Sequence, residues 1–332
     1  MIIGKYPNLR LRRSRKHSWS RRLIQENSLS ANDFILPIFL VDGKNTIKKI
    51  NSMPDVYRYS IDKLGIIVDK AIKNKIPMVA LFPYTNNKKK DKFGREALNE
   101  ENLVCKGITY IKKKYKNEIG IMCDVALDPY TSHGHDGLLK SGYVLNDETI
   151  EILIKQSLLQ AQMGCDVIAP SDMMDGRIGK IRKVLDKNGH HMVQIISYAV
   201  KYASSFYGPF RDAVGSIKSL KSDKKNYQMD FSNSEEAFRE VALDIKEGAD
   251  MVLVKPGLPY LDIIRQTKDN FKIPVIAYQV SGEYSLIKNG IKKKIIGEDS
   301  ILESLMSFKR AGASAIVTYF ALQAANKIKK IN

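Results

Sequence analysis

The sequence predicts an α/β protein of the (β/α)8 TIM-barrel class with an extended N-terminal arm, on three observations. Eight short apolar runs recur along the 332 residues. The segments that follow them have helical periodicity. Three helix-to-strand junctions also resemble one another: MGCDVIAP, EGADMVLV and AGASAIVT. Such repetition of one supersecondary unit favours a barrel, and a doubly wound open sheet is the alternative.

The eight apolar runs are rich in β-branched residues and do not alternate strictly with polar ones. That composition is typical of parallel strands buried on both faces, with helices outside. The predicted strands cover residues 34–41, 78–83, 119–127, 167–170, 193–199, 251–255, 275–280 and 315–319.

The helical segments have recognisable ends. Residues 147–163 begin with an acidic first turn, and residues 234–247 begin at Ser234, a plausible N-cap. Residues 299–311 form a third example, and a glycine follows each of the three. We therefore expect three well-bounded helices between strands.

An arm of residues 1–32 precedes the predicted barrel domain of residues 33–332. The arm is polar and Arg-rich, and it contains Trp19, the only tryptophan. A basic segment with an aromatic residue outside the barrel is a candidate for wrapping a neighbouring subunit. We expect it to serve oligomerisation.

Composition excludes several classes of protein. No apolar run approaches the ~20 residues needed to span a bilayer, and no apolar stretch or cleavage site follows the basic N-terminus. Three cysteines without CxxC spacing do not make a disulfide framework and suit a reducing compartment. We expect a cytoplasmic protein with no membrane partner.

The net charge of +18 raises the question of nucleic-acid binding. The excess is mostly Lys spread over separate segments, as at 86–92, 110–117 and 291–296, and Arg clusters only at 10–22. No pattern of a known nucleic-acid-binding module is present. Solvated surface lysines are the favoured interpretation, so no nucleic-acid partner is expected, and a basic nucleic-acid-binding protein is the alternative class.

Two lysines stand at the ends of predicted strands, where a barrel places its catalytic groups. Burial lowers the pKa of a lysine, and a second ammonium nearby acts in the same direction. A neutral amine attacks a ketone or aldehyde to form an imine. We therefore predict that Lys201 and Lys255 hold a carbonyl substrate as Schiff bases; salt-bridged structural lysines, or a class I aldolase, are the alternatives. The other polar residues at predicted strand ends are Asp124, Asp128, Ser171, Asp172, Ser281 and Tyr319.

Residues around the two lysines strengthen this prediction. Pro256 favours an extended backbone at Lys255, and Gly257 would permit close approach of a ligand. Residues 202–216 are expected to form a long active-site loop. Within it, Arg211 is a candidate for binding a substrate carboxylate with two hydrogen bonds, against the alternative of an ordinary surface arginine.

Six stretches around these residues form a specific pattern: DVALDPYTSHGHDG (124–137), APSDMMDGR (169–177), SYAVKYASSFYGPFRDA (197–213), ADMVLVKPGLPYLDI (249–263), YQVSGEY (278–284) and IVTYF (316–320). On these stretches the chain resembles the porphobilinogen synthase (5-aminolevulinate dehydratase) family over nearly all of its length after the arm. The resemblance implies condensation of two 5-aminolevulinate molecules to porphobilinogen in tetrapyrrole and haem biosynthesis, a lyase reaction that releases two waters.

The same resemblance implies roles for individual residues. Lys255 would form the Schiff base with the first substrate and Lys201 with the second. Two residues would bind each substrate carboxylate: Ser281 and Tyr319 for the first, Arg211 and Lys224 for the second. Lys224 is a departure, because many members have Arg at this point of the motif, and a lysine lacks the two-pronged geometry of a guanidinium.

The resemblance also bears on metal dependence. Zinc-dependent members place three cysteines at the positions of Ala126, Asp128 and Asp136, none of which is Cys here. Carboxylates suit magnesium or proton transfer rather than zinc. The chain is therefore similar to the aspartate-type, magnesium-responsive subgroup without cysteine-bound catalytic zinc. In that subgroup Asp124, Asp128, Asp136 and Ser171 would line the second-substrate pocket.

Glu240 matches the position at which that subgroup binds an allosteric magnesium ion near a subunit interface; an exposed helix carboxylate is the alternative. His133 and His135 are expected to be loop residues rather than metal ligands. The family further implies a homo-octamer built from dimers that embrace through their arms, with magnesium favouring the large form.

Overall fold

The computed structural model describes residues 4–215, 220 and 223–331 of the chain. Residues 1–3 of the predicted arm, Ser216 of the predicted active-site loop and residue 332 of the predicted barrel domain lie outside the described residues, as do 217–219, 221 and 222.

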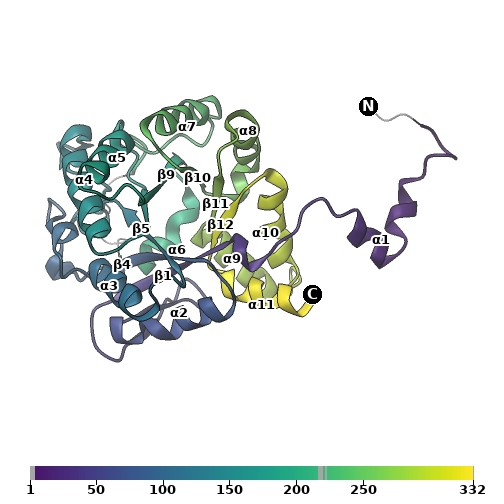
Figure 1. Ribbon diagram of the computed structural model, residues 1–332, viewed down its shortest axis with the longest axis horizontal. Coiled ribbons are helices and arrows are strands. Elements are labelled where there is room, and N and C mark those ends of the chain that lie inside the picture. Colours follow the sequence, from purple (N-terminus) through teal and green to yellow (C-terminus); the bar gives the residue numbers. More distant parts are fainter. Residues whose placement is uncertain (1–3, 216–219, 221–222, 332) are drawn as a thin grey trace.

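Eight parallel strands form a closed barrel (Figure 1). The barrel closes because the last strand pairs with the first, with Phe34 opposite Ile316 and Ile35 opposite Val317. The predicted barrel is therefore confirmed and the open sheet is wrong. The eight strands are β1 (Phe34–Val41), β4 (Met78–Tyr84), β5 (Gly120–Val125), β8 (Val167–Pro170), β9 (Gln194–Lys201), β10 (Met251–Lys255), β11 (Val275–Gln279) and β12 (Ala315–Thr318).

Two small additions flank the barrel. Strand β3 (Tyr57–Tyr59) pairs with β1 and with β2 (Ile47–Lys49). A separate hairpin joins β6 (Leu139–Lys140) to β7 (Tyr143–Val144). Both lie in connections that follow barrel strands.

All the helices except α1 lie around the barrel in Figure 1. Their apolar faces pack on strands whose residues are almost all buried, and β1 is buried at every position. No helix among the described residues is long and apolar enough to cross a membrane. The helices are α1 (Ser18–Leu23), α2 (Leu64–Lys73), α3 (Leu103–Tyr115), α4 (Asn146–Gln162), α5 (Arg177–Lys187), α6 (Gly208–Ala213), α7 (Glu235–Glu247), α8 (Leu261–Phe271), α9 (Ser281–Lys292), α10 (Ser300–Ala311) and α11 (Ala321–Ile331).

The three helices predicted with defined ends are α4, α7 and α10, each within one residue of its predicted bounds. Gly248 and Gly312 adopt left-handed conformations, with φ of 107° and 104°, directly after α7 and α10. The predicted N-cap position of Ser234 is confirmed. Ser234 takes the N-cap position, but its backbone is not extended there and its side chain makes no capping hydrogen bond.

The segment after Lys201 is more regular than the loop that the sequence predicted. It forms a 3-10 turn at Ser205–Tyr207 and then helix α6, with a proline in the first turn. Ser204 initiates the turn, because its Oγ accepts a hydrogen bond from the Phe206 N–H. The segment therefore presents Arg211 from a helix.

The N-terminal segment extends away from the barrel in Figure 1, where α1 lies well outside the ring of helices. Its apolar side chains remain exposed: Trp19 is 60% exposed and Leu23 is 77% exposed. A short 3-10 turn at Ala31–Asp33 then leads the chain into β1.

Candidate active site

Lys201 and Lys255 lie side by side at one mouth of the barrel. Each is the last residue of its strand, and the parallel register of β9 and β10 places Lys255 directly opposite Lys201. Both are buried. The two amines that the sequence singled out are therefore neighbours at the carboxyl ends of the strands.

Aromatic rings surround the amine of Lys255. Its Nζ lies between 4.6 and 5.4 Å from the ring centroids of Tyr198, Tyr207, Phe210 and Tyr278. Within the described part of the chain, Nζ has no hydrogen bond or ion pair. Burial, and after it the charge of Lys201, lower the pKa of Lys255 to about 7, although Asp124, Asp128 and Asp136 act in the opposite direction. A large fraction of this amine is neutral at neutral pH.

Lys201 has polar surroundings instead. Its Nζ donates a hydrogen bond to Asp136 Oδ1 at 3.1 Å and another to the carbonyl oxygen of Ser171. The carboxylate and the carbonyl stabilise an ammonium at this position. The two lysines are thus held in different environments, one apolar and aromatic, the other anionic.

Asp136 is the centre of a hydrogen-bonded cluster. Lys224 Nζ lies 2.7 Å from its Oδ2, and the Tyr227 hydroxyl donates to the same oxygen at 2.7 Å. Burial alone would raise the pKa of Asp136, but the charges of Lys201 and Lys224 outweigh burial and hold that pKa well below its usual range. Asp136 is therefore a permanent carboxylate that orients two cations.

Asp124 has a different electrostatic balance. Burial, followed by repulsion from Asp128, raises the pKa of Asp124 to about 6, against the opposing effects of Lys255, Lys201 and a hydrogen bond with Ser171. A carboxyl group with a pKa near neutrality can both accept and donate protons. Asp124 is the candidate for proton transfer between the two amines.

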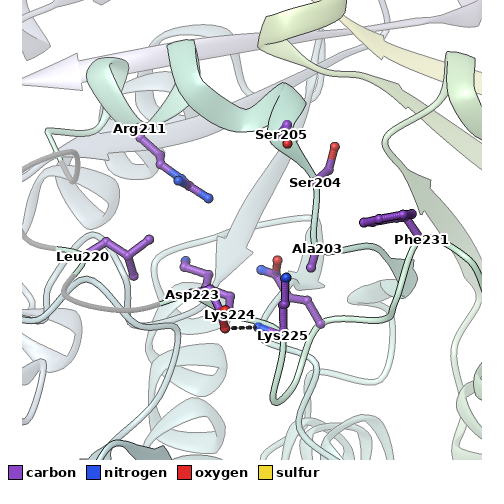
Figure 2. Close-up of a pocket in the computed structure, with 10 residues that line it drawn as sticks. Ala203, Ser204, Ser205, Arg211, Leu220, Asp223, Lys224, Lys225 and Phe231 are labelled. Atoms are coloured by element: carbon purple, nitrogen blue, oxygen red, sulfur yellow. Dashed lines mark hydrogen bonds between the residues drawn. The ribbon is translucent and has the colours of Figure 1, made fainter.

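Arg211 and Lys224 face a cavity of about 560 Å³ from opposite sides, as Figure 2 shows. Arg211 reaches it from α6, and Lys224 from the chain segment below. Lys201 and Lys255 are not among the described residues that line this cavity. Lys224 connects it to them, because Lys224 also pairs with Asp136 and, at 3.6 Å, with Asp128.

Ser281 and Tyr319 lie against the aromatic surroundings of Lys255. Ser281 is the first residue of α9, and its Oγ accepts a hydrogen bond from the Phe210 N–H at 2.9 Å. The Tyr319 hydroxyl is 3.2 Å from the Tyr278 hydroxyl. Phe210 and Tyr278 both border the Lys255 amine. The three residues predicted from the sequence, Lys255, Ser281 and Tyr319, therefore lie together.

Packing gives Gly257 a constraint that the sequence did not indicate. A Cβ at this position would lie 2.4 Å from Phe308 Cε1 and 3.0 Å from the Tyr278 carbonyl oxygen. Close packing of the turn after Lys255 against the protein itself therefore requires glycine here, whereas approach of a ligand stays a prediction.

His133 and His135 are buried and make hydrogen bonds within the protein. His133 Nε2 is 3.2 Å from the Lys92 carbonyl oxygen, and His135 Nδ1 is 3.2 Å from the Tyr227 hydroxyl. In the parts of the chain that the structure describes, no three His, Cys, Asp or Glu side chains are grouped as metal ligands. The two histidines hold the loop that carries Asp136.

Two residues at this mouth escaped the sequence interpretation. Tyr227 binds Asp136, and its only signal was its place in the motif that contains Lys224. Lys90 was hidden in a run of lysines; its Nζ donates to the Gly215 carbonyl oxygen at 3.3 Å. Burial lowers the pKa of Lys90, and Asp128 opposes this. A charge run can therefore conceal one half-buried cation.

Comparison with known proteins identifies the family. The model of the delta-aminolevulinic acid dehydratase family matches residues 8–327. The chain belongs to this family. The dehydratase of Bradyrhizobium diazoefficiens is 55% identical over 322 residues, covering 97% of this chain and 91% of the relative. That of Rhodobacter capsulatus is 48% identical and covers 99% of both chains.

A solved structure agrees with the fold and the family. The delta-aminolevulinic acid dehydratase of Toxoplasma gondii ME49, in complex with its reaction product porphobilinogen, superimposes with a TM-score of 0.94 at 45% identity. The match covers 96% of this chain and 91% of that one. It extends over nearly the whole chain, so the barrel mouth described above falls within a fold shared with the family.

The lowered pKa of Lys255 predicts a specific pH profile for this member of the dehydratase family. Because the amine is protonated below about pH 7, the predicted imine formation on Lys255 should fall about tenfold for each pH unit below 7 and level off near pH 8 to 9. Cyanoborohydride trapping of 5-aminolevulinate at several pH values, with peptide mapping, measures this profile. A rate that keeps rising to pH 10 would contradict it.

Proposed function

We propose that this protein condenses two molecules of 5-aminolevulinate to porphobilinogen, as a hydro-lyase of tetrapyrrole and haem biosynthesis, and holds both substrates as Schiff bases. One observation carries the proposal: the register of β9 and β10 sets Lys201 and Lys255 side by side at one barrel mouth. Family membership supports the substrate, and the two adjacent amines support the chemistry.

The neutral amine of Lys255 attacks the ketone of one substrate, and the ketone oxygen leaves as water. Lys201 reacts in the same way with the second substrate after it gives up a proton, which Asp124 can accept, since its pKa is about 6 and it interacts electrostatically with both amines. Each imine forms with loss of one water, which accounts for both waters released. Joining the two substrates then frees both lysines.

Charged and polar groups around the mouth fit two carboxylate-bearing substrates. Arg211 and Lys224 lie on opposite sides of the outer cavity, where they can bind the second substrate's carboxylate. Ser281 and Tyr319 lie beside Lys255, where they can bind the first. Lys224 also pairs with Asp136, so it must exchange part of that contact for the substrate.

Reductive trapping tests the proposal directly. Borohydride reduction in the presence of 5-aminolevulinate should attach substrate to Lys255 or Lys201, and colorimetric detection should show a pyrrole product. Modification of neither lysine would refute the Schiff-base chemistry. Trapping without a pyrrole would indicate another imine-forming barrel enzyme, such as an aldolase.

We also propose that magnesium acts at Glu240, away from the reacting amines. Glu240 lines a cavity of about 220 Å³ together with Asp175, Glu236 and Asn146. Burial raises the pKa of Glu240 to about 7; Arg177 opposes this, and nearby carboxylates add to it. Three carboxyl groups outnumber the one cation in this lining, Lys225. Oxygen donors of this kind fit Mg²⁺, which is commonly bound through one or two carboxylates and retained waters.

Cysteine-bound catalytic zinc does not fit the residues at the mouth. All three cysteines are buried and free, and Cys165 Sγ donates to the carbonyl oxygens of Ile121 and Val167. Burial, and next contact with Cys165, raise the pKa of Cys123 well above its usual value. Its thiol is therefore poorly suited to act as a thiolate ligand.

Replacement of Glu240 by Ala is expected to abolish stimulation by Mg²⁺ and to leave basal activity within about twofold, because in the described chain Glu240 forms no hydrogen bond or ion pair with either lysine. Glu235→Ala, an exposed change at the start of the same helix, is the control. Rates of pyrrole formation with and without millimolar Mg²⁺, and with a zinc-selective chelator, measure both effects. Full dependence on added Zn²⁺ would contradict the proposal.

For assembly, we propose a homo-octamer built from dimers that embrace through their arms, with magnesium favouring the octamer. The exposed Trp19 and Leu23 provide the apolar contacts that such an arm needs. We further propose a cytoplasmic location, which suits three free thiols. Sedimentation analysis with and without Mg²⁺ tests the assembly.

A further inference from the structure

We propose that Glu283 is a positioning residue for the reaction: its carboxylate ties together the turn that follows Lys255 and the turn that carries Ser281. Nothing in the sequence singled it out, because a glutamate in the first turn of a helix is ordinary. The inference rests on the proposed Schiff-base chemistry at Lys255.

Glu283 joins the ends of two neighbouring strands. Its Oε1 accepts a hydrogen bond from the Leu258 N–H, and its Oε2 accepts one from the Val280 N–H, both at 2.5 Å. The Gly257 N–H also bonds this carboxylate. Gly257 lies two residues after Lys255, and Val280 directly precedes Ser281. One side chain therefore fixes the positions of both functional residues.

The burial of Glu283 shows that the contact is specific. Glu283 is 3% exposed, and within the described residues no lysine, arginine or histidine forms an ion pair with it. A buried carboxylate without a cation is unfavourable unless strong hydrogen-bond donors compensate. Here backbone N–H groups do so, although burial still raises the pKa of Glu283 to about 7.

The two turns are also packed closely enough for small movements to reach the amine. At Gly282, an added Cβ would lie 2.4 Å from the Phe206 carbonyl oxygen, and Gly257 has the same tight contact with Phe308. The Lys255 carbonyl oxygen accepts a hydrogen bond from the Tyr202 N–H at 3.0 Å. Backbone displacement around Glu283 would shift Lys255 within its ring of aromatic side chains.

Glu283→Gln tests the proposal, because it keeps the size of the side chain but places an NH₂ group against backbone N–H donors. We expect trapping of 5-aminolevulinate on Lys255 to slow by on the order of tenfold or more, because a small misplacement of the reacting amine is costly. The apparent pKa of the trapping reaction should also change. Glu283→Asp should give an intermediate rate. Glu303→Gln, exposed in the first turn of α10, is the control.

The outcomes separate this inference from the proposed function. If the unmodified protein is not trapped on Lys255, the Schiff-base chemistry is wrong. If it is trapped, and folded Glu283→Gln matches it within twofold in rate and in apparent pKa, the positioning role is wrong. Should Glu283→Gln fail to fold, a folded Glu283→Asp with an unchanged trapping rate overturns the positioning role. Failure of both variants to fold also overturns it, because Glu283 would then serve stability alone.

Discussion

Replacement of Lys255 by Met is expected to lower kcat/KM for 5-aminolevulinate by on the order of 10⁴-fold or more, because it removes the proposed nucleophile of the covalent step. The variant should still fold. Four aromatic rings surround the Lys255 amine, and an unbranched apolar side chain suits that space. Pyrrole formation at saturating and subsaturating substrate measures the loss.

The same variant should be more stable than the unmodified protein near neutral pH. Because the pKa of Lys255 is about 7 when folded and near 10.4 in an unfolded chain, the unfolded state binds more protons between these values. Burial of the amine therefore destabilises the folded state, most strongly below pH 7 and not at all above about pH 10. The two pKa values correspond to about 4 kcal/mol at pH 7, so we expect a gain of that order, seen by urea unfolding.

Lys201→Met is the matched comparison, because it should abolish activity but decrease stability. Lys201 donates to Asp136 and to the Ser171 carbonyl, so its loss leaves a buried carboxylate with less compensation. Opposite signs of the two stability changes are the distinguishing result. Retention of more than about one hundredth of the activity by Lys255→Met would contradict a nucleophilic role.

The sequence was sufficient to predict the barrel and the two lysines for a physical reason. Strands buried on both faces and helices ended by glycine are local patterns, and repeating them leaves few topologies. Once a barrel is predicted, the ends of its strands are also predicted, and Lys201 and Lys255 stand there. The register that sets one lysine opposite the other follows from the pairing of β9 with β10, which no local pattern specifies.

The sequence did not reveal which polar residues pair with one another. Lys224 was expected to bind a substrate carboxylate, yet it also contacts Asp136 and Asp128. Tyr227, Lys90 and Glu283 depend on contacts between segments far apart in the chain. Gly257 was interpreted from its neighbour Lys255, whereas its constraint comes from Phe308, some fifty residues later. Non-local packing decides such cases.

Replacement of Arg177 by Met is expected to destabilise the protein by about 3–5 kcal/mol. The contacts of Arg177, like those above, join segments that are distant in the sequence. Arg177 is 1% exposed, with Nε 3.4 Å from Asp172 Oδ2 and Nη1 3.6 Å from Asp244 Oδ1. It also donates to the Tyr198 carbonyl oxygen at 3.3 Å. Its removal leaves two buried carboxylates without their cation.

The pH dependence of this loss gives the sharper test. Burial raises the pKa of Asp172 to about 6 even though Arg177 opposes the shift, so ionised Asp172 already destabilises the folded state above that pH. Without Arg177, the cost in folding free energy of burying ionised Asp172 grows at pH 7. That cost shrinks as the pH falls towards 5, where Asp172 becomes protonated. Arg265→Met, which removes an exposed ion pair with Asp269, should change stability by less than about 1 kcal/mol at either pH. Two results would show that the buried charges do not determine stability here. In one, Arg177→Met loses no more free energy of unfolding than the control. In the other, its loss of stability grows on acidification.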